Sequence, residues 1–266
     1  MNDSAPSFPL PRVTPNHRHA FGGVWRLTFR RFMGGPAQWL AFAAMLLLLG
    51  LAEFAIVRDG RVSAFSDWTV RMYFGFLIPA VAFLSGAGAI REEMKSGSVD
   101  YVLTRPVQRP AFVVFKFFSH LACVQAAALV GLGVVLLVAN LRHITGLVEV
   151  LPWLLLAQAI SITAFMAFGF FCGLVTSRFL VLGLAYGAVV EVGLGRIPTQ
   201  LSRLSLTHQI SAMLEPIMPA AAPALASEQT TLGTVGAVLS FAAVMLAIVM
   251  VVFRWRELVG EHTREV

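Results

Sequence analysis

Hydrophobic and polar positions follow one another in long blocks along this chain. Six apolar stretches are separated by short polar segments. Each is close in length to the about 20 residues that a helix needs to cross the hydrocarbon core of a bilayer. We therefore predict an all-α integral membrane protein with six transmembrane helices, whose even number places both termini on one side. The stretches cover residues 38–57, 72–90, 111–139, 151–176, 179–195 and 232–253.

The segment before the first apolar stretch, residues 20–35, has an amphipathic pattern. Aromatic residues recur every three or four positions, arginines occupy other positions of the helical turn, and two glycines close the segment. This pattern predicts an interfacial helix with aromatic side chains at the headgroup boundary and arginines on anionic lipid. A basic flank to the first span is the alternative. The residues are Phe21, Trp25, Phe29 and Phe32, and Arg26, Arg30 and Arg31.

The polar segment 91–116 is too elaborate for a simple turn between the second and third stretches. Val99, Val102 and Leu103 share one helical face, Asp100 suits the first turn, and Pro106 ends the helix. We expect a short helix that lies across the membrane surface. Its apolar strip needs a protein partner if lipid does not cover it. The alternative is a solvated charged loop.

Composition and charge support a membrane protein and indicate its orientation. The chain is 58% hydrophobic and 13% charged, which exceeds what a water-soluble domain of this length can bury. The net charge is +6, but the basic residues form no continuous patch, so we expect no nucleic-acid partner. Fourteen of the 20 Lys and Arg residues fall on the side of the termini and segment 91–116. By the positive-inside rule that side is cytoplasmic. We expect the protein to lie in the cell (inner or plasma) membrane.

Segment 91–116 resembles the corresponding loop of ABC-2 type transporter permeases, the transmembrane subunits of ABC exporters. In that loop an acidic pair, a Gly-Thr pair, a leucine-containing helix, a proline–arginine turn and a lysine follow one another. Ser98 stands where threonine is usual and keeps the capping hydroxyl. The matching residues are Glu92 and Glu93, Gly97 and Ser98, Leu103, Pro106 with Arg109, and Lys116.

The resemblance implies a coupling helix that docks on a separate ABC ATPase subunit. It also implies two ATPase copies that bind ATP and Mg, a second permease copy or a homologous permease, and export. No GxxxxGK[ST] stretch occurs in the sequence, so we expect this chain to bind no cofactor directly and to have no ATPase activity of its own. The expected coupling residues are Glu92, Glu93, Lys95, Gly97, Ser98, Val102, Leu103, Arg105, Pro106, Arg109 and Lys116.

A few polar residues interrupt the apolar stretches and are candidates for the translocation path or its gate. Ionisable groups inside a membrane are costly and are functional candidates by default. Glu191 either lines a cavity or serves as a gate, or reaches water from the end of its span. Gln125 and Gln158 fit interhelical hydrogen bonds better than cargo binding. Glu53 lies near an outer end, where we expect its carboxylate to reach water.

Small residues and one proline predict how the spans pack. Glycines at four-residue spacing, Gly169/Gly173 and Gly183/Gly187, let helices approach closely. They indicate intramolecular packing of the fourth and fifth spans, whereas the resemblance implies a fifth span near a dimer axis. Pro79 should kink the second span. The small-residue segment 85–89 then leads into the cytoplasmic loop and should transmit its movement.

The remaining segments complete the predicted organisation. Residues 1–19 form a proline-rich cytoplasmic tail that we expect to be disordered, residues 20–257 the transmembrane domain, and residues 258–266 a C-terminal tail. The outer loop 196–231 contains enough leucine for one or two short helices, which the resemblance places as re-entrant helices. Cys123 and Cys172 lie in apolar stretches, so neither a disulfide nor a metal site is expected.

Three other functions are compatible with parts of this pattern. A six-span secondary transporter driven by an ion gradient would need carboxylates near mid-membrane or discontinuous helices in paired repeats. An intramembrane enzyme would need a motif such as HExxH or GxSxG, and neither occurs. A scaffold that does not transport would differ by failing to stimulate any ATPase.

Overall fold

The computed structural model describes residues 17–34, 36–57, 62–94, 109–193, 195, 202, 204–218 and 231–255, and every regular element within them is helical. The elements are α1 (His17–Met33), α2 (Pro36–Ile56), α3 (Val62–Trp68), the π-helix η1 (Thr69–Leu77), α4 (Ile78–Met94), α6 (Arg109–Leu141), α7 (Leu147–Val175), α8 (Phe179–Tyr186), the π-helix η2 (Gly187–Gly193), α9 (Leu206–Leu214) and α10 (Thr231–Trp255).

Long apolar helices make up most of the described chain. Four of them are long and apolar enough to cross a membrane, and two shorter apolar helices coincide with the first and fifth predicted stretches. The all-helical membrane architecture is thus confirmed, while the count of six spans stays a prediction. The four long helices are Val62–Met94, Pro110–Leu141, Leu147–Val175 and Thr231–Arg254, and the shorter ones are Phe42–Ile56 and Phe179–Gly193.

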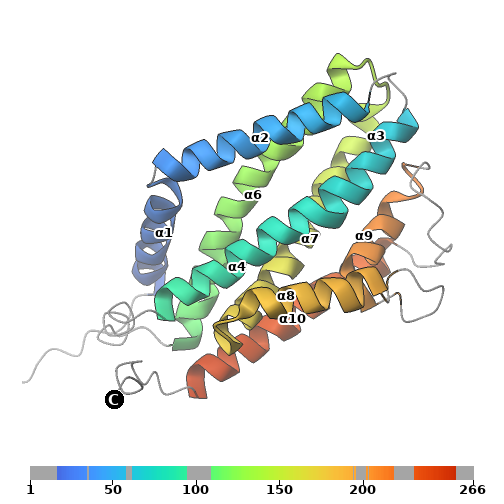
Figure 1. The fold of residues 1–266 in the computed structure, drawn as a ribbon. Coiled ribbons are helices and arrows are strands. Elements are labelled where there is room, and N and C mark those ends of the chain that lie inside the picture. The colour runs from blue at the N-terminus through green and yellow to red at the C-terminus, as the bar shows by residue number, and fades with distance from the viewer. Residues whose placement is uncertain are drawn as a thin grey trace, which may run out of the picture.

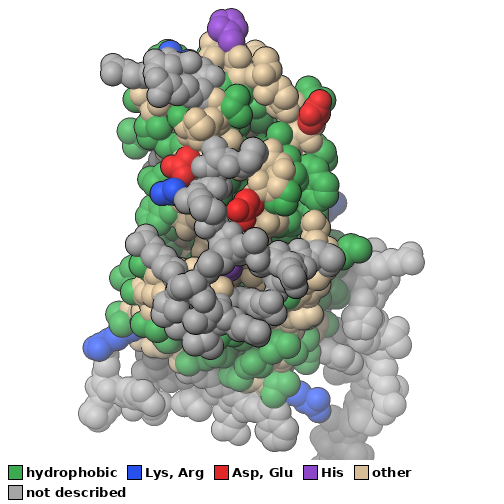
Figure 2. Space-filling model, turned by 90° about the vertical axis from the view of Figure 1, so that its right-hand side faces the viewer, with side chains coloured by type: hydrophobic (Ala, Val, Ile, Leu, Met, Phe, Trp, Pro, Cys, Tyr) green, Lys and Arg blue, Asp and Glu red, His purple; other side chains and the backbone are tan. Residues whose placement is uncertain are grey.

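The long helices run roughly side by side, and α3, η1 and α4 follow one another in a continuous run (Figure 1). Helix α1 lies across the end at which α4 finishes, α6 starts and α10 finishes, whereas α3 and α9 lie towards the other end. Figure 2 views the side on which α3 and α9 lie, and its described surface is mainly hydrophobic or neutral, with scattered charges. Large apolar side chains such as Leu40 and Leu184 stay more than 70% exposed, as expected for a surface that lipid covers.

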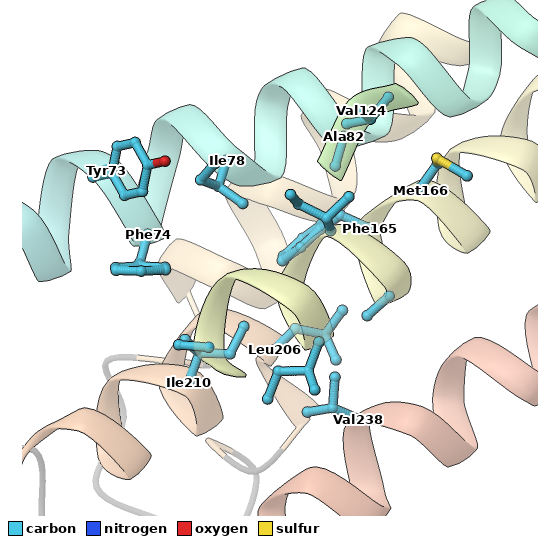
Figure 3. Packing of buried hydrophobic residues seen from close by; sticks show 14 of the residues in the cluster. Tyr73, Phe74, Ile78, Ala82, Val124, Phe165, Met166, Leu206, Ile210 and Val238 are labelled. Carbon is cyan, nitrogen blue, oxygen red and sulfur yellow. The ribbon is translucent and has the colours of Figure 1, made fainter. Parts of the chain in front are cut away.

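Helix α7 is the centre of the fold. It packs against α4, α6, α8, α9 and α10. In its most apolar stretch of 18 residues 67% of the residues are buried, against 17% in the corresponding stretch of α10. Figure 3 shows the core where these helices meet, with Tyr73 and Phe74 from η1, Phe165 from α7 and Leu206 from α9. The core therefore joins elements that lie far apart in the sequence.

Glycine allows the close approach of α4 and α7. A Cβ atom at Gly173 would lie 2.7 Å from the Ala87 carbonyl oxygen, and one at Gly169 would meet the Phe83 carbonyl oxygen. The glycine pair of the fourth span was predicted to pack within the chain, and its partner is the second span. Gly183, on the fifth span, packs against the Phe83 ring.

The second span differs from its prediction at two points. It begins at Val62 rather than at residue 72, because Phe65 and Trp68 face the core and Asp67 pairs with Arg71 across one helical turn at 2.6 Å. Irregular backbone lies ahead of Pro79, in the π-helix Thr69–Leu77. Proline offers no backbone N–H to the carbonyl one turn earlier, so the turn before it is free to adopt the wider hydrogen-bond pattern.

The interfacial segment forms a helix, and its partners are now defined. Helix α1 ends at Met33, before the two closing glycines. Phe21 packs edge-on against Phe115, with ring centroids 5.5 Å apart, and Phe32 against the His120 ring at 6.0 Å. One face of α1 is therefore fixed to α6, while Trp25 and Phe29 remain exposed.

Candidate coupling site at the junction of α1, α4 and α6

Glu93 forms the centre of an ion cluster at the end of α4. Its side chain is only 6% exposed, and its Oε1 atom accepts a hydrogen bond of 2.8 Å from Nζ of Lys116, itself 3% exposed. Glu93 and Lys116 belong to the two helices that flank residues 95–108. The ion pair therefore joins the last turn of α4 to a point two turns into α6.

A second cation reaches the same carboxylate oxygen from α1. Nη1 of Arg31 lies 2.9 Å from Glu93 Oε1, and the Arg31 side chain is 42% exposed. Charge-assisted hydrogen bonds of this kind are about twice as strong as neutral ones, and a buried carboxylate requires such partners. The cluster thus joins α1, α4 and α6 at one point.

Local helix geometry explains why these residue types meet here. A carboxylate in the last turn of a helix is unfavourable, because the helix dipole is negative there. Two cations offset this effect at Glu93. Arg31 lies in the last turn of α1, where a positive charge is favoured. Its guanidinium binds Glu93, which the sequence did not predict, and its expected contact with anionic lipid stays a prediction.

The predicted coupling residues fall into three groups. Glu93 and Lys116 are buried and paired with each other, and Glu92 is exposed beside them. Arg109 is the first residue of α6. The others lie outside the described residues, so their roles stay predictions: Lys95, Gly97, Ser98, Val102, Leu103, Arg105 and Pro106.

Glu191 lies on η2 and binds the start of α9. Its Oε2 atom accepts hydrogen bonds from the Ser205 hydroxyl at 2.6 Å and the Thr207 backbone N–H at 3.0 Å, and its Oε1 atom accepts one from the Leu206 backbone N–H at 3.1 Å. Ser205 also caps the helix by accepting from the backbone N–H of His208. A carboxylate here satisfies free helical N–H groups and the positive end of the dipole. Its role in a path or gate stays a prediction.

Comparison with protein families identifies the chain. The model of the ABC-2 family transporter protein matches residues 36–258. The chain belongs to the ABC-2 transporter family. A search of curated proteins gave no match. The resemblance inferred from segment 91–116 is thereby confirmed, and this chain is a membrane permease of the ABC-2 type.

Two glutamines in the ABC-2 permease connect neighbouring helices, as predicted. Nε2 of Gln125 on α6 donates to the Ala159 carbonyl of α7 at 3.0 Å. The Tyr73 hydroxyl of η1 donates to Oε1 of Gln158 at 2.9 Å or to the Ala128 carbonyl at 3.0 Å. These contacts confirm an interhelical role, and a part in the translocation path stays a prediction. Sequence analysis missed Tyr73, which lies among apolar residues and has no local signal.

Glu53 of the ABC-2 permease was predicted to reach water from the end of its span, and this was wrong. Its side chain is fully buried, and neither carboxylate oxygen has a hydrogen-bond partner among the described residues. Helix α2 turns this position towards α3 and α6, against which it packs. The apolar pattern around Glu53 could not show which side of α2 faces the protein.

Proposed function

We propose that this permease spans the membrane six times and moves its cargo by using ATP that a separate ABC ATPase hydrolyses. Residues 95–108 would dock on the ATPase, which would bind ATP and Mg. The complex would contain two ATPase subunits and a second permease, either another copy of this chain or a homologue. We further propose that transport is outward across the cell membrane.

The ion cluster at Glu93 is the observation that carries this proposal. It ties the two helices that flank segment 95–108 to each other and to α1, with distances of 2.8 and 2.9 Å. A force on the segment would therefore move α1, α4 and α6 together. The close glycine contacts between α4 and α7 would pass this movement to the centre of the fold.

The arrangement of the helix ends supports the proposed orientation. Helix α1, the last turn of α4, the first turn of α6 and the last turn of α10 all lie at one end of the bundle (Figure 1). The chain segments that adjoin these helix ends hold most of the Lys and Arg residues. A cytoplasmic location of this end follows from the positive-inside rule.

ATPase activity in a reconstituted bilayer tests the proposal. The full chain is purified with the ATPase encoded beside it, and hydrolysis is compared between the native chain and a Val102→Asp, Leu103→Asp variant. Val148→Asp is the matched control, because Val148 is an 84% exposed apolar residue in the first turn of α7, outside segment 91–116.

We expect the double variant to lose ATPase binding or coupled hydrolysis and the control to retain both. If no nucleotide-binding protein associates, or if the double variant hydrolyses ATP at the native rate, the proposal of ATP coupling through this segment is wrong. An ion-driven transporter would then be tested by collapsing the membrane gradient.

A further inference from the structure

A cavity of about 610 Å³ lies beside the ion cluster, between α1, α2, α4 and α6. Aromatic side chains form one side of it: Phe29 and Phe32 from α1, and Trp39 and Phe42 from α2. On the opposite side, Gly88 of α4 has no atom within 4 Å of the position that a Cβ would take. The cavity has the size of a small-molecule site.

A smaller cavity extends the apolar space further along the bundle. It has about 110 Å³ and shares Phe32, Phe42 and Ser85 with the first. Its other end lies at Tyr73 and Gly131, between η1 and α6. The two cavities together offer a narrow apolar region behind a wider aromatic one, which suits an elongated molecule.

Two polar side chains of the larger cavity can accept hydrogen bonds from a ligand. Glu92 contributes an exposed carboxylate. The Nε2 atom of His120 is buried and has no partner within the described part of the chain. The His120 ring lies edge-on against Phe32, with ring centroids 6.0 Å apart. A neutral imidazole offers an acceptor at the ring nitrogen that carries no proton.

We propose that this cavity binds an amphiphile that carries a protonated primary amine. The ammonium donates to the Glu92 carboxylate and to Nε2 of His120, while the alkyl or aryl body lies among the aromatic side chains and extends towards Tyr73. Two acceptors, one of them anionic, favour a cationic donor and disfavour an anionic head group. Aromatic faces also attract a cation within about 6 Å.

Two sources can supply this ligand chemistry. One is a soluble alkylamine that enters from the lipid phase, and the other is the amine head group of a phospholipid in the adjacent leaflet. The site belongs to this chain alone, so the inference does not depend on ATP coupling. A binding measurement without ATPase or nucleotide therefore tests it separately from the proposed function.

Equilibrium binding of radiolabelled dodecylamine to the full chain in phosphatidylcholine nanodiscs tests the site, with empty nanodiscs subtracted. Gly88→Leu fills the cavity and should weaken binding at least about tenfold. Gly133→Leu is the matched control, because Gly133 also lies in open space on a membrane helix but outside both cavities. This control should bind as the native chain does.

Head-group selectivity provides the second readout. Glu92→Gln should weaken dodecylamine binding about tenfold and leave dodecanol binding within about twofold, because only the amine uses the charge. His120→Phe keeps the ring packing and should weaken dodecylamine binding by a smaller factor than Glu92→Gln does. If phosphatidylethanolamine in the nanodisc competes, the lipid head group is the source, and if it does not, a soluble amine is.

Two results would overturn the inference. Equal binding of dodecylamine and dodecanol in the native chain would show that the acceptors recognise no amine. Unchanged binding in both Gly88→Leu and Glu92→Gln would show that the amine binds elsewhere. Neither result would bear on whether the permease stimulates an ATPase.

Discussion

Lys116 and Glu93 close the connection between α4 and α6 with an ion pair of 2.8 Å in which both side chains are almost fully buried. Helices α4 and α6 are therefore joined by an interaction inside the protein rather than by surface charges. Arg31 adds α1 to the same pair through its more exposed guanidinium. The two cations should differ in their contributions to stability.

The Lys116→Met variant should lose about 3 kcal/mol of stability, because removing one partner of a buried ion pair leaves the other charge poorly compensated. Arg31→Gln should lose only about 0.2 to 1 kcal/mol, since that pair is partly exposed and screened by solvent. Unfolding of the detergent-solubilised chain measures both values. A larger loss in the arginine variant would contradict this order.

The double variant Glu93→Leu, Lys116→Met provides the control for this pair. Removing both charges leaves no unpaired buried ion, so the double variant should recover part of the loss seen with Lys116→Met. Coupled ATPase activity should remain low, because the two helix ends are no longer tied by charge. Full recovery of coupling would show that packing alone connects these helices.

Glu191→Gln should loosen the start of α9. The amide keeps one acceptor oxygen but loses the charge that serves four donors: the Ser205 hydroxyl, the Leu206 backbone N–H, and the backbone N–H and hydroxyl of Thr207. We expect a loss of about 1 to 2 kcal/mol, seen as faster hydrogen exchange in the first turn of α9. Glu149→Gln, at an exposed position in the first turn of α7, should change exchange there much less.

The stability of the outer segment should fall on acidification. Burial lowers the pKa of His208 from its ordinary value of 6.5, and the carboxylates of Glu215 and Glu191 oppose this shift in part. The unfolded chain therefore binds a proton at higher pH than the folded chain, so stability rises with pH between the lowered pKa and 6.5. The contribution is complete above 6.5 and is lost as the pH falls through this window.

Thermal midpoints of the native chain and His208→Gln between pH 5 and 7.5 measure this contribution. The thermal midpoint of the glutamine variant should fall less on acidification, since glutamine cannot take up the proton. Parallel curves for the two proteins would assign the pH dependence to other groups.

Close packing of α4 and α7 makes Gly173 sensitive to a single methyl group. In Gly173→Ala the new Cβ would lie 2.7 Å from both the Ala87 carbonyl oxygen and Cγ2 of Ile90. Overpacking of this kind costs about 1 to 3 kcal/mol. Gly236→Ala on α10 meets no atom within 4 Å and should leave stability unchanged or raise it by up to about 1 kcal/mol. Equal effects would show that the helices separate readily.

Hydrophobic length and residue spacing predicted much of this fold. The apolar stretches gave the positions of the long helices, because crossing a bilayer requires a minimum length. Periodic aromatic residues gave α1, and clustered leucines in the outer loop gave the helix Leu206–Leu214. The partner of Gly169/Gly173 was missed, since spacing shows that a face is narrow without showing which helix it meets.

The other errors concern relationships between distant parts of the chain. Arg31 and Glu93 are 62 positions apart, and no local pattern links them. The burial of Glu53 depends on how α2 is rotated, which a uniformly apolar helix does not reveal. The small-residue segment 85–89 also divides unexpectedly, because Gly86 meets the Met166 backbone while Gly88 opens onto a cavity.

The fifth apolar helix has a consequence for mutational tolerance. No residue between Phe179 and Gly193 is buried in the single chain, although Gly183 lies against the Phe83 ring. A saturation library expressed as isolated chains should therefore accept nearly any apolar residue along α8, with Gly183 as the sharp exception. Positions that become restricted only when transport is selected would mark a face of α8 that is needed for transport rather than for folding of the single chain.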